Sequence, residues 1–234
     1  MTTEKEYLRS YDKNEFDRPS VAVDLLVFTV HEDRLKVVLI ERSEHPYKDM
    51  LSLPGVFVGI DETLDHAAKR GAAEEAGLTD IYFEQLYTWG EVERDPRMRI
   101  ISVSYLSLTD HRKLNLKAGK RTASAALYDV DELLSSDKAI AFDHRKMIEY
   151  GRERIRNKVE YSTIAFELLP KEFTLPALQR VYELILGRPV HKANFRRKIA
   201  DLIEETERMT SGDAHRPSKF YRLKSDISAT DKSL

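Results

Sequence analysis

The chain has 234 residues, of which 41% are hydrophobic and 33% are charged, with a formal net charge of −2; these values describe an ordinary soluble protein of one or two domains. It has no cysteine, which excludes a disulfide framework and a thiolate metal site. The longest apolar run, residues 25–30, is too short to cross a bilayer, and the polar start lacks the apolar core of a signal peptide, so we expect a cytoplasmic protein with no membrane partner.

Strand and helix patterns alternate along the first 150 residues. Apolar runs at 21–30 and 35–40 predict two buried strands joined by a short turn, and strand-like patterns return at 81–89, 100–108 and 125–128. Helices are expected from about residue 130 and from about residue 143, and the polar residues 1–20 are expected to form an irregular arm or a partner contact. Such alternation is typical of a mixed sheet covered by helices, so we expect one domain over residues 1–150.

The segment from residue 53 to residue 78 carries charged residues at fixed spacing. Thr63 is a suitable N-cap for a helix that Gly77 would end. Arg70 lies one helical turn before Glu74, close enough to orient that carboxylate by a charged hydrogen bond. In this frame the segment resembles a Nudix box, the strand–loop–helix element that holds a metal ion and a nucleoside diphosphate. The resemblance assigns ligand-binding positions to Glu62, Arg70, Glu74 and Glu75.

Two positions of this segment depart from the Nudix pattern, because Val56 replaces the leading glycine and Gly71 replaces a glutamate. Residues 71 and 75 lie one turn apart, so carboxylates at both could share Mg²⁺, but glycine supplies no oxygen. We therefore expect weak Mg²⁺ binding at most, no required cofactor, no metal site and no catalytic residues. The alternative role for Gly71 is to let the helix pack closely against a sheet, together with Ala67, Ala68 and Ala72.

Further candidates for ligand binding lie between two of the expected strands. Arg94, Arg97 and Arg99 fall within six residues and could clamp a diphosphate. The alternative is a solvated hairpin tip with Pro96 in a turn. Trp89, the single tryptophan, could stack on a base or could belong to the core.

From residue 151 to residue 234 the sequence predicts a second, basic domain. Thr174 is a suitable N-cap for a helix over 175–186, which Gly187 would end. After a short turn, a helix from about residue 192 is expected to bury Phe195, Ile199, Leu202 and Ile203. Two strands, 205–209 and 219–224, would then form a hairpin around residues 210–218. This order is typical of a winged helix-turn-helix that binds double-stranded DNA.

The second helix of this unit has a basic face that also carries an amide. We expect Asn194 and Arg197 to read base edges. Contacts with backbone phosphates are expected from Lys192, Arg196, Lys198, Arg216 and Lys219. The alternative is a small helical cap with a charged surface.

The whole chain beyond residue 20 resembles the Nudix-related transcriptional regulators of the NrtR type. The resemblance rests on the degenerate Nudix box and on short segments that include 143–144, 166–170, 173–174, 181–183, 194–198 and 216–217. It implies an α+β protein, with an N-terminal Nudix-like α/β/α sandwich around a mixed sheet and a C-terminal winged helix-turn-helix. Family members are dimeric repressors of NAD-metabolism genes that bind ADP-ribose as effector. Met98 stands where relatives often have glycine, a departure within the arginine-rich loop.

The hypothesis is therefore an ADP-ribose-responsive repressor that binds a near-palindromic operator as a homodimer. The first alternative is an active Nudix hydrolase of ADP-ribose-like nucleoside diphosphates. The second is a regulator of the same architecture whose effector is a sugar or a sugar phosphate.

Overall fold

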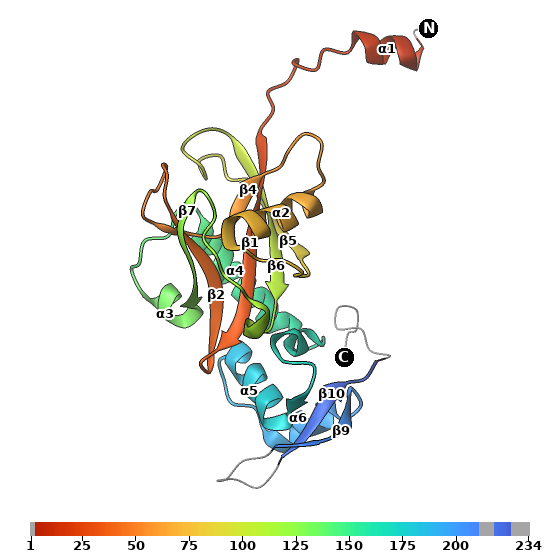
Figure 1. Cartoon of the computed structure of the whole chain (residues 1–234). Helices are drawn as coiled ribbons and strands as arrows, with labels where there is room; N and C mark the ends of the chain where they lie inside the picture. The colour runs from red at the N-terminus through yellow and green to blue at the C-terminus, as the bar shows by residue number, and fades with distance from the viewer. Residues whose placement is uncertain (1–2, 211–217, 226–234) are drawn as a thin grey trace.

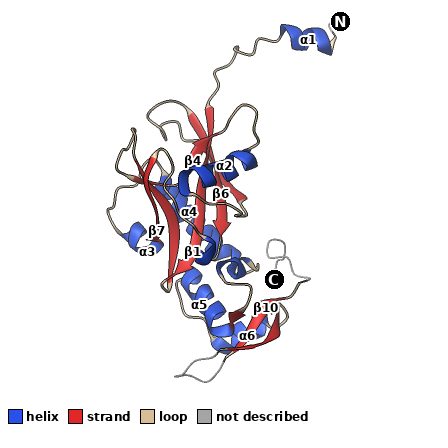
Figure 2. Cartoon of the chain, viewed as in Figure 1, coloured by secondary structure: helices blue, strands red, loops and turns tan. Residues whose placement is uncertain are grey.

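The computed structural model describes residues 3–210 and 218–225 (Figure 1). Its N-terminal part is a mixed sheet with helices on both faces, and its C-terminal part is a smaller unit of helices and a short sheet (Figure 2). This is the expected α+β architecture with an α/β/α sandwich. No helix in these two ranges is long and apolar enough to span a membrane.

The large sheet is built around β1 (Ser20–His31), in the strand order β3-β2-β1-β6-β5. β6 (Ile100–Leu108) runs parallel to β1, whereas β2 (Arg34–Arg42) and β5 (Glu84–Trp89) pair antiparallel with β1 and β6 respectively. The remaining strands also pair antiparallel: β3 (Leu51–Ser52) and β7 (Thr122–Asp129) with β2, and β4 (Gly55–Phe57) with β1. The expected strands are confirmed, except that the segment 81–89 becomes a strand only from Glu84 onward.

One face of the sheet is covered by α2 (Leu64–Ala76), the helix of the Nudix-like segment. Thr63 accepts a hydrogen bond from the backbone N–H of His66, and Gly77 ends the helix with a left-handed φ of 68°, as expected from the sequence. Apart from Glu75, the buried residues of α2 are alanines and one glycine, which allows the helix to lie close to the apolar side chains of β1 and β6. The sequence therefore placed this helix correctly from its two ends.

The other face is covered by α3 (Val130–Ser135) and α4 (His144–Lys158), and the short 3-10 helix η1 (His111–Lys113) follows β6. Gly151 lies where α4 crosses β1. A Cβ added at this position would lie 2.6 Å from Cδ2 of Leu26 and 3.1 Å from Cε2 of Phe28. Only glycine lets the two elements approach this closely.

The C-terminal unit has the expected winged-helix order. It consists of η2 (Ile164–Leu168), β8 (Phe173–Thr174), α5 (Leu175–Leu186), α6 (Lys192–Ile199), β9 (Ile203–Met209) and β10 (Lys219–Leu223). Thr174 caps α5 by accepting a hydrogen bond from the N–H of Ala177, and Gly187 ends it with a φ of 67°. The three strands form a second sheet in the order β8-β10-β9, and residues 211–217 of the wing lie outside the described residues.

Helix α6 is shorter than the sequence suggested. Leu202 and Ile203 were expected on its buried face, and both are buried, but the helix ends at Ile199. Ile203 instead begins β9 and pairs with Leu223 of β10. The expectation of a longer helix was wrong because apolar spacing cannot distinguish a helical turn from a tight turn that enters a strand.

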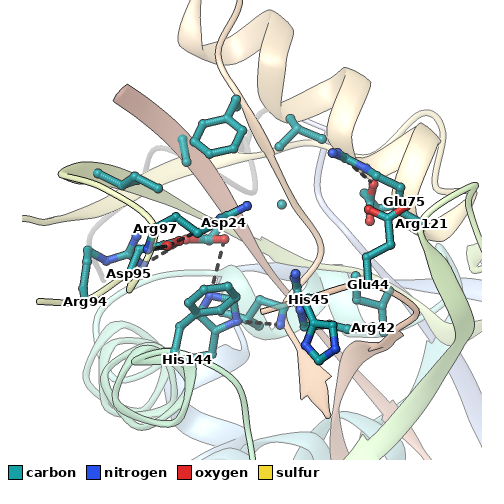
Figure 3. Close-up of a pocket in the computed structure, with 18 residues that line it drawn as sticks. Asp24, Arg42, Glu44, His45, Glu75, Arg94, Asp95, Arg97, Arg121 and His144 are labelled. Carbon is teal, nitrogen blue, oxygen red and sulfur yellow. Dashed lines mark hydrogen bonds and ion pairs between the residues drawn. The ribbon is translucent and has the colours of Figure 1, made fainter. Parts of the chain in front are cut away.

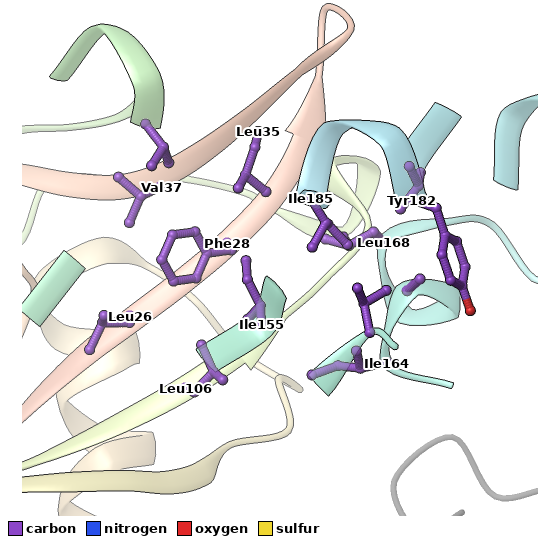
Figure 4. Close-up of a cluster of buried hydrophobic side chains, with 14 of the residues drawn as sticks. Leu26, Phe28, Leu35, Val37, Leu106, Ile155, Ile164, Leu168, Tyr182 and Ile185 are labelled. Carbon is purple, nitrogen blue, oxygen red and sulfur yellow. The ribbon is translucent and has the colours of Figure 1, made fainter. Parts of the chain in front are cut away.

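A single hydrophobic cluster runs from the large sheet into the winged helix (Figure 4). Leu26 and Phe28 of β1 are fully buried in it, and so are Ile155 of α4 and Ile185 of α5. Helix α4 also crosses residue 150, the position at which we expected the boundary between the domains. The two parts of the chain are therefore joined by a packed core as well as by the backbone.

The N-terminal arm contains a helix, α1 (Glu4–Ser10), where the sequence suggested an irregular segment. Thr3 and Glu6 form a capping box, in which each side chain binds the backbone N–H of the other residue. The arm projects away from the body (Figure 1), and α1 has no buried residue.

Candidate ligand pocket and nucleic-acid interface

A pocket opens where the ends of several elements of the large sheet domain meet (Figure 3). It encloses about 760 Å³ of empty space, part of which is open to solvent. Its polar and aromatic lining includes Asp24, Arg42, Glu44, His45, Phe57, Glu75, Arg94, Asp95, Arg97, Arg121, Phe142 and His144. Three of the expected ligand-binding residues, Glu75, Arg94 and Arg97, thus lie in this pocket.

Arg42, at the end of β2, contributes a positive charge to the pocket. Its Nε donates a hydrogen bond to the backbone oxygen of Pro46 at 2.8 Å, and in the described part of the chain it forms no ion pair. Burial, with the nearby charge of Arg97, lowers the pKa of Arg42 below its ordinary value. An anionic ligand would relieve this repulsion, so the pocket is suited to bind phosphate groups.

Two aromatic rings alternate with two guanidinium groups across the pocket. The guanidinium carbon of Arg97 lies 5.3 Å from the ring centroid of Phe57 and 5.9 Å from that of Phe142. On the Phe142 ring there is a second cation, Arg42, at 5.0 Å. Cations at these distances are attracted to ring faces, and a planar aromatic group of a ligand can stack on the same surfaces.

A buried polar network forms the floor of the pocket. Arg94 binds both carboxylate oxygens of Asp143, at 3.0 and 2.8 Å, and reaches Asp24 at 3.4 Å. Ser102 donates a hydrogen bond to the same carboxylate of Asp24. Only 8% of Arg94 is exposed, so its charge is neutralised within the protein. This is a correction to its expected role as a diphosphate clamp: it holds β1 to the start of α4.

His144, the first residue of α4, closes the same floor. Its Nδ1 accepts a hydrogen bond from the backbone N–H of Leu53 at 2.9 Å, and its Nε2 lies 3.6 Å from Asp24. Burial lowers the pKa of His144, which keeps the imidazole neutral and able to accept that hydrogen bond.

Of the charged residues expected to bind ligand in the Nudix-like segment, only Glu75 lines the pocket. Arg70 donates to Glu62, to Glu74 and to the backbone oxygen of Phe57, and none of these three charged residues lines the pocket. The Arg70 hydrogen bond holds the pKa of Glu62 down, at about 2. Glu75 faces the pocket, 3.6 Å from Arg121, and its burial raises its pKa.

This arrangement does not fit the metal site of a Nudix hydrolase. Within the described residues, no group of three or more His, Asp or Glu side chains could hold a metal ion. Glu62 and Glu74 are occupied by Arg70, and no second carboxylate stands one turn from Glu75, because that position is Gly71.

Trp89 and Arg99 lie outside the pocket, contrary to their expected role. Trp89 donates a hydrogen bond from Nε1 to Ser104 and packs on neighbouring tyrosine rings, so it belongs to the surface of the sheet. Arg99 is exposed and donates to the backbone oxygen of Glu91. Sequence reasoning missed Arg42, Phe57, Arg121, Phe142 and His144 as pocket residues, although the segment 143–144 had carried part of the family resemblance.

The candidate nucleic-acid interface is the exposed side of α6. Phe195 and Ile199 are buried, while Asn194, Arg196 and Arg197 are exposed. Arg197 donates a hydrogen bond to Oδ1 of Asn194 at 3.2 Å, which holds the two expected base-reading side chains together. Lys192 is also exposed, and it forms no ion pair with any described residue. The helix thus presents amide and guanidinium groups on one surface.

Two of the expected phosphate contacts are engaged within the protein. Lys198 donates to the backbone oxygen of Glu160 at 2.5 Å and lies 5.7 Å from the ring centroid of Tyr182. Lys219 forms a cross-strand ion pair with Glu205 at 2.5 Å. Arg216, which was also expected to contact phosphate, lies outside the described residues.

Two known protein families match this chain, one in each of its two structural parts. Residues 18–151 match the NUDIX domain family, and residues 165–223 match the NrtR DNA-binding winged helix domain. The two matches correspond to the sheet domain and to the C-terminal unit described above.

Two relatives, one of them seen in two solved structures, extend this match. An ADPR-responsive transcriptional repressor of Acinetobacter baylyi is 32% identical over 231 residues, which cover 95% of this chain and 89% of that protein. The crystal structure of Shewanella oneidensis NrtR complexed with a 27mer DNA is similar with a TM-score of 0.77 and 33% identity, covering 92% of this chain and 99% of that one. The NUDIX domain of the same S. oneidensis protein, in a cocrystal structure with ADP ribose, gives a TM-score of 0.60 and 34% identity over 65% of this chain and 99% of that one. The chain therefore belongs to the NrtR family of Nudix-related transcriptional regulators.

Proposed function

We propose that this protein is an ADP-ribose-responsive repressor of transcription, acting on genes of NAD metabolism. The observation that carries the proposal is that one continuous chain combines an arginine-lined pocket in a Nudix-type domain with a winged helix. Relatives of the same two-domain extent include an ADPR-responsive repressor and a regulator crystallised on DNA. ADP-ribose carries a diphosphate, which suits the guanidinium groups of the pocket, and an aromatic base, which suits its phenylalanine rings.

In the proposed complex the diphosphate is held by guanidinium groups of the pocket. Arg42 makes the main contribution, because it forms no ion pair with any carboxylate of the described residues, and Arg97 and Arg121 can turn from Asp95 and Glu75 toward the ligand. Guanidinium groups bind phosphate bidentately, which favours a diphosphate over an uncharged sugar. The adenine base is assigned to the ring surfaces of Phe57 and Phe142.

The proposed function does not include efficient hydrolysis. Attack of water on a diphosphate in a Nudix site relies on divalent cations that neutralise the phosphates and activate the water. Gly71 supplies no carboxylate one turn from Glu75, and Glu62 and Glu74 bind Arg70. The ligand would therefore act as a signal that is bound and released unchanged.

In the proposed mechanism, ADP-ribose changes how tightly the protein binds operator DNA. Asn194 and Arg197 would read base edges in the major groove, and Lys192 and Arg196 would contact phosphates. An effector changes DNA affinity only if it binds the DNA-competent and the incompetent states with different affinity. Couplings of this kind usually change affinity by about 5- to 150-fold, and the ligand and the DNA must affect each other's binding by the same factor.

The test is a reciprocal titration. A duplex would first be selected from random DNA by the purified protein, and its Kd measured by fluorescence anisotropy with and without ADP-ribose. ADP-ribose should weaken the complex, while ribose and uncharged nucleosides should not. Equal DNA affinity at saturating ADP-ribose would contradict the repressor proposal. Release of AMP from ADP-ribose with Mg²⁺, at rates on the order of 1–10³ per second, would favour a hydrolase instead.

A further inference from the structure

The hairpin formed by β1 and β2 extends from the ligand pocket to the winged helix. Asp24, near the start of β1, and Arg42, at the end of β2, both line the pocket. At its other end the hairpin closes with a two-residue turn, Glu32 and Asp33, which lies beside α5 (Figure 1). The two strands stay paired up to this turn. One continuous element therefore has one end in the pocket and the other end against the winged helix.

The turn is joined to α5 by an ion pair. Arg180 of α5 donates hydrogen bonds from Nε and Nη2 to the two carboxylate oxygens of Asp33, both at 2.6 Å. These hydrogen bonds hold the pKa of Asp33 below its usual value. A two-point contact fixes direction as well as distance. Within residues 3–210 and 218–225, no other ion pair joins the range 18–151 to the range 165–223.

The backbone of the turn is unfavourable for its sequence. Glu32 and Asp33 have φ angles of 53° and 58°, in the left-handed region. Two-residue hairpin turns of this kind favour Asn-Gly or Asp-Gly, because side chains such as that of glutamate rarely adopt this conformation. Unfavourable backbone conformations are concentrated at functional positions. Turn propensity does not explain the Glu-Asp sequence, whereas the contact of Asp33 with Arg180 gives this position a role.

A cleft separates the hairpin from the winged helix beside the ion pair. It encloses about 790 Å³ of empty space, part of which is open to solvent. Its lining comes from both parts of the molecule and includes His31, Arg112, Leu169 and Pro170. Packed interiors leave no space of this size, so the two surfaces are not close-packed here. Their separation can change when the ion pair breaks, while the shared core keeps the two parts joined.

From Arg180 the contacts continue to the turn that precedes α6. Nη1 of Arg180 lies 3.9 Å from Oε2 of Glu183. Glu183 in turn accepts hydrogen bonds from the backbone N–H of Val190 and from Nε2 of Gln179, both at 3.1 Å. The same amide of Gln179 donates to the backbone oxygen of Val190 at 3.1 Å. Arg180 therefore contacts the side chain that holds the turn between α5 and α6.

We propose that the ion pair between Asp33 and Arg180, called the interdomain latch below, transmits ADP-ribose binding from the pocket to the winged helix. The proposal rests on the proposed function. A ligand held by Arg42 acts on one end of the hairpin, and the latch passes a displacement of the other end to α5 and, through Glu183, to α6. Asp33 and Arg180 contact neither ADP-ribose nor DNA in this mechanism, so they are positioning residues.

The expected effect of the latch is moderate. An exposed ion pair changes an equilibrium by at most about fivefold. Allosteric ligands usually change each other's affinity by about 5- to 150-fold. The latch therefore carries a measurable part of the coupling, and the shared core carries the remainder.

The first experiment measures the coupling directly. The Kd of ADP-ribose is determined by calorimetry for the full chain, with and without the selected duplex at saturation, and the ratio of the two values is the coupling factor. Asp33→Asn and Arg180→Gln should each lower this factor by about two- to fivefold. Asparagine tolerates the left-handed backbone of the turn, so Asp33→Asn removes the charge and keeps the hairpin. The Kd without DNA should stay at the parent value, because neither residue lines the pocket.

Two further variants show whether the two residues act as a pair. The double variant should have the same coupling factor as each single variant, because all three lack the same contact. Asp131→Asn is the matched control. The side chain of Asp131 is 68% exposed, against 64% for Asp33, and its ion pair with Arg152 lies within the large sheet domain. This variant should keep the coupling factor of the parent.

The second experiment uses no DNA. ADP-ribose should change the rate of amide hydrogen exchange in the turn at residues 187–191 of the parent, and should change it less in Asp33→Asn. A pair that only stabilised the fold would leave this ligand-induced change the same in both proteins.

The outcomes separate the latch from the proposed function. If ADP-ribose and DNA are coupled in the parent but the coupling factor is unchanged in Asp33→Asn and Arg180→Gln, the latch is wrong and the proposed function stands. A control that loses as much coupling as Asp33→Asn, or a double variant that loses clearly more than either single one, would also overturn the latch. Equal ADP-ribose affinities of the parent with and without DNA would contradict the proposed function, and the latch with it.

Discussion

Val56 occupies the space that a side chain at residue 71 would require. A Cβ added to Gly71 would lie 2.8 Å from Cγ2 and 3.3 Å from Cγ1 of Val56, and the valine is only 5% exposed. The two departures from the Nudix pattern therefore form one packing arrangement between β4 and α2. The valine and a side chain at residue 71 cannot share this space, which supports the close-packing role considered for Gly71.

The first prediction follows from this contact. Gly71→Glu alone should destabilise the protein by about 1–3 kcal/mol, because the new side chain is forced against buried Val56. Gly71→Glu with Val56→Gly should remove the clash and place a carboxylate one turn from Glu75. Urea unfolding measures the stability, and calorimetric titration measures Mg²⁺ binding, which only the double variant should gain. If the single variant is as stable as the double one, the packing argument is wrong.

The second prediction concerns the unpaired cation of the pocket. Arg42→Gln should weaken ADP-ribose binding by about 1.5–3 kcal/mol, the usual contribution of a hydrogen bond to a charged group. Adenosine, which lacks the diphosphate, should bind both proteins equally. Arg99→Gln is the matched control, because Arg99 lies outside the pocket and donates only to a backbone oxygen. Calorimetry that finds equal losses for both variants would exclude Arg42 as the phosphate-binding residue.

Much of the fold could be predicted because its signals are local. The caps of α2 and α5 were identified from Thr63, Gly77, Thr174 and Gly187, each of which acts within a few residues of its own position. The central strands were identified from continuous apolar runs, which are typical of strands that are buried on both faces. The end of α6 could not be identified in this way, since it depends on pairing between β9 and β10.

The pocket was harder to predict because the partners of its charged side chains come from distant parts of the sequence. The role of Arg94 is decided by Asp24 and Asp143, which lie 70 and 49 residues away in the sequence. No local pattern distinguishes this arginine from Arg97, which keeps an exposed side chain. Arg42 belonged to no motif, and what sets it apart is that no carboxylate among the described residues lies near enough to form an ion pair with it.

The third prediction is a pH dependence caused by His144. Its folded-state pKa lies below the ordinary value of 6.5, so the unfolded chain binds more protons as the pH falls below that value. The contribution of His144 to stability is therefore present above pH 6.5 and is lost progressively on acidification. His144→Asn can still accept the hydrogen bond from Leu53 but does not titrate. Unfolding free energies at pH 7.5 and pH 5.5 should differ more in the parent than in this variant, and an equal difference would contradict the assignment.

The last prediction distinguishes the residues of α6 by what they bind in the free protein. Arg197 and Asn194 are exposed and bound to each other, so each should keep its side chain available for a base edge. Replacing either by alanine should lower operator affinity by about 1–3 kcal/mol and relax sequence preference. Arg196→Ala should weaken binding to all sequences equally and reduce its salt dependence.

Lys198 provides the internal comparison for that experiment. It was expected to contact phosphate, but its ammonium group already binds the backbone oxygen of Glu160, and burial lowers its pKa. Reaching DNA would require it to give up that hydrogen bond, so Lys198→Ala should change the salt dependence less than Arg196→Ala does. Anisotropy titrations over a range of salt concentrations measure both slopes. A larger change for Lys198 than for Arg196 would mean that α6 turns a different side toward the groove, and the assignment of Asn194 and Arg197 would fail with it.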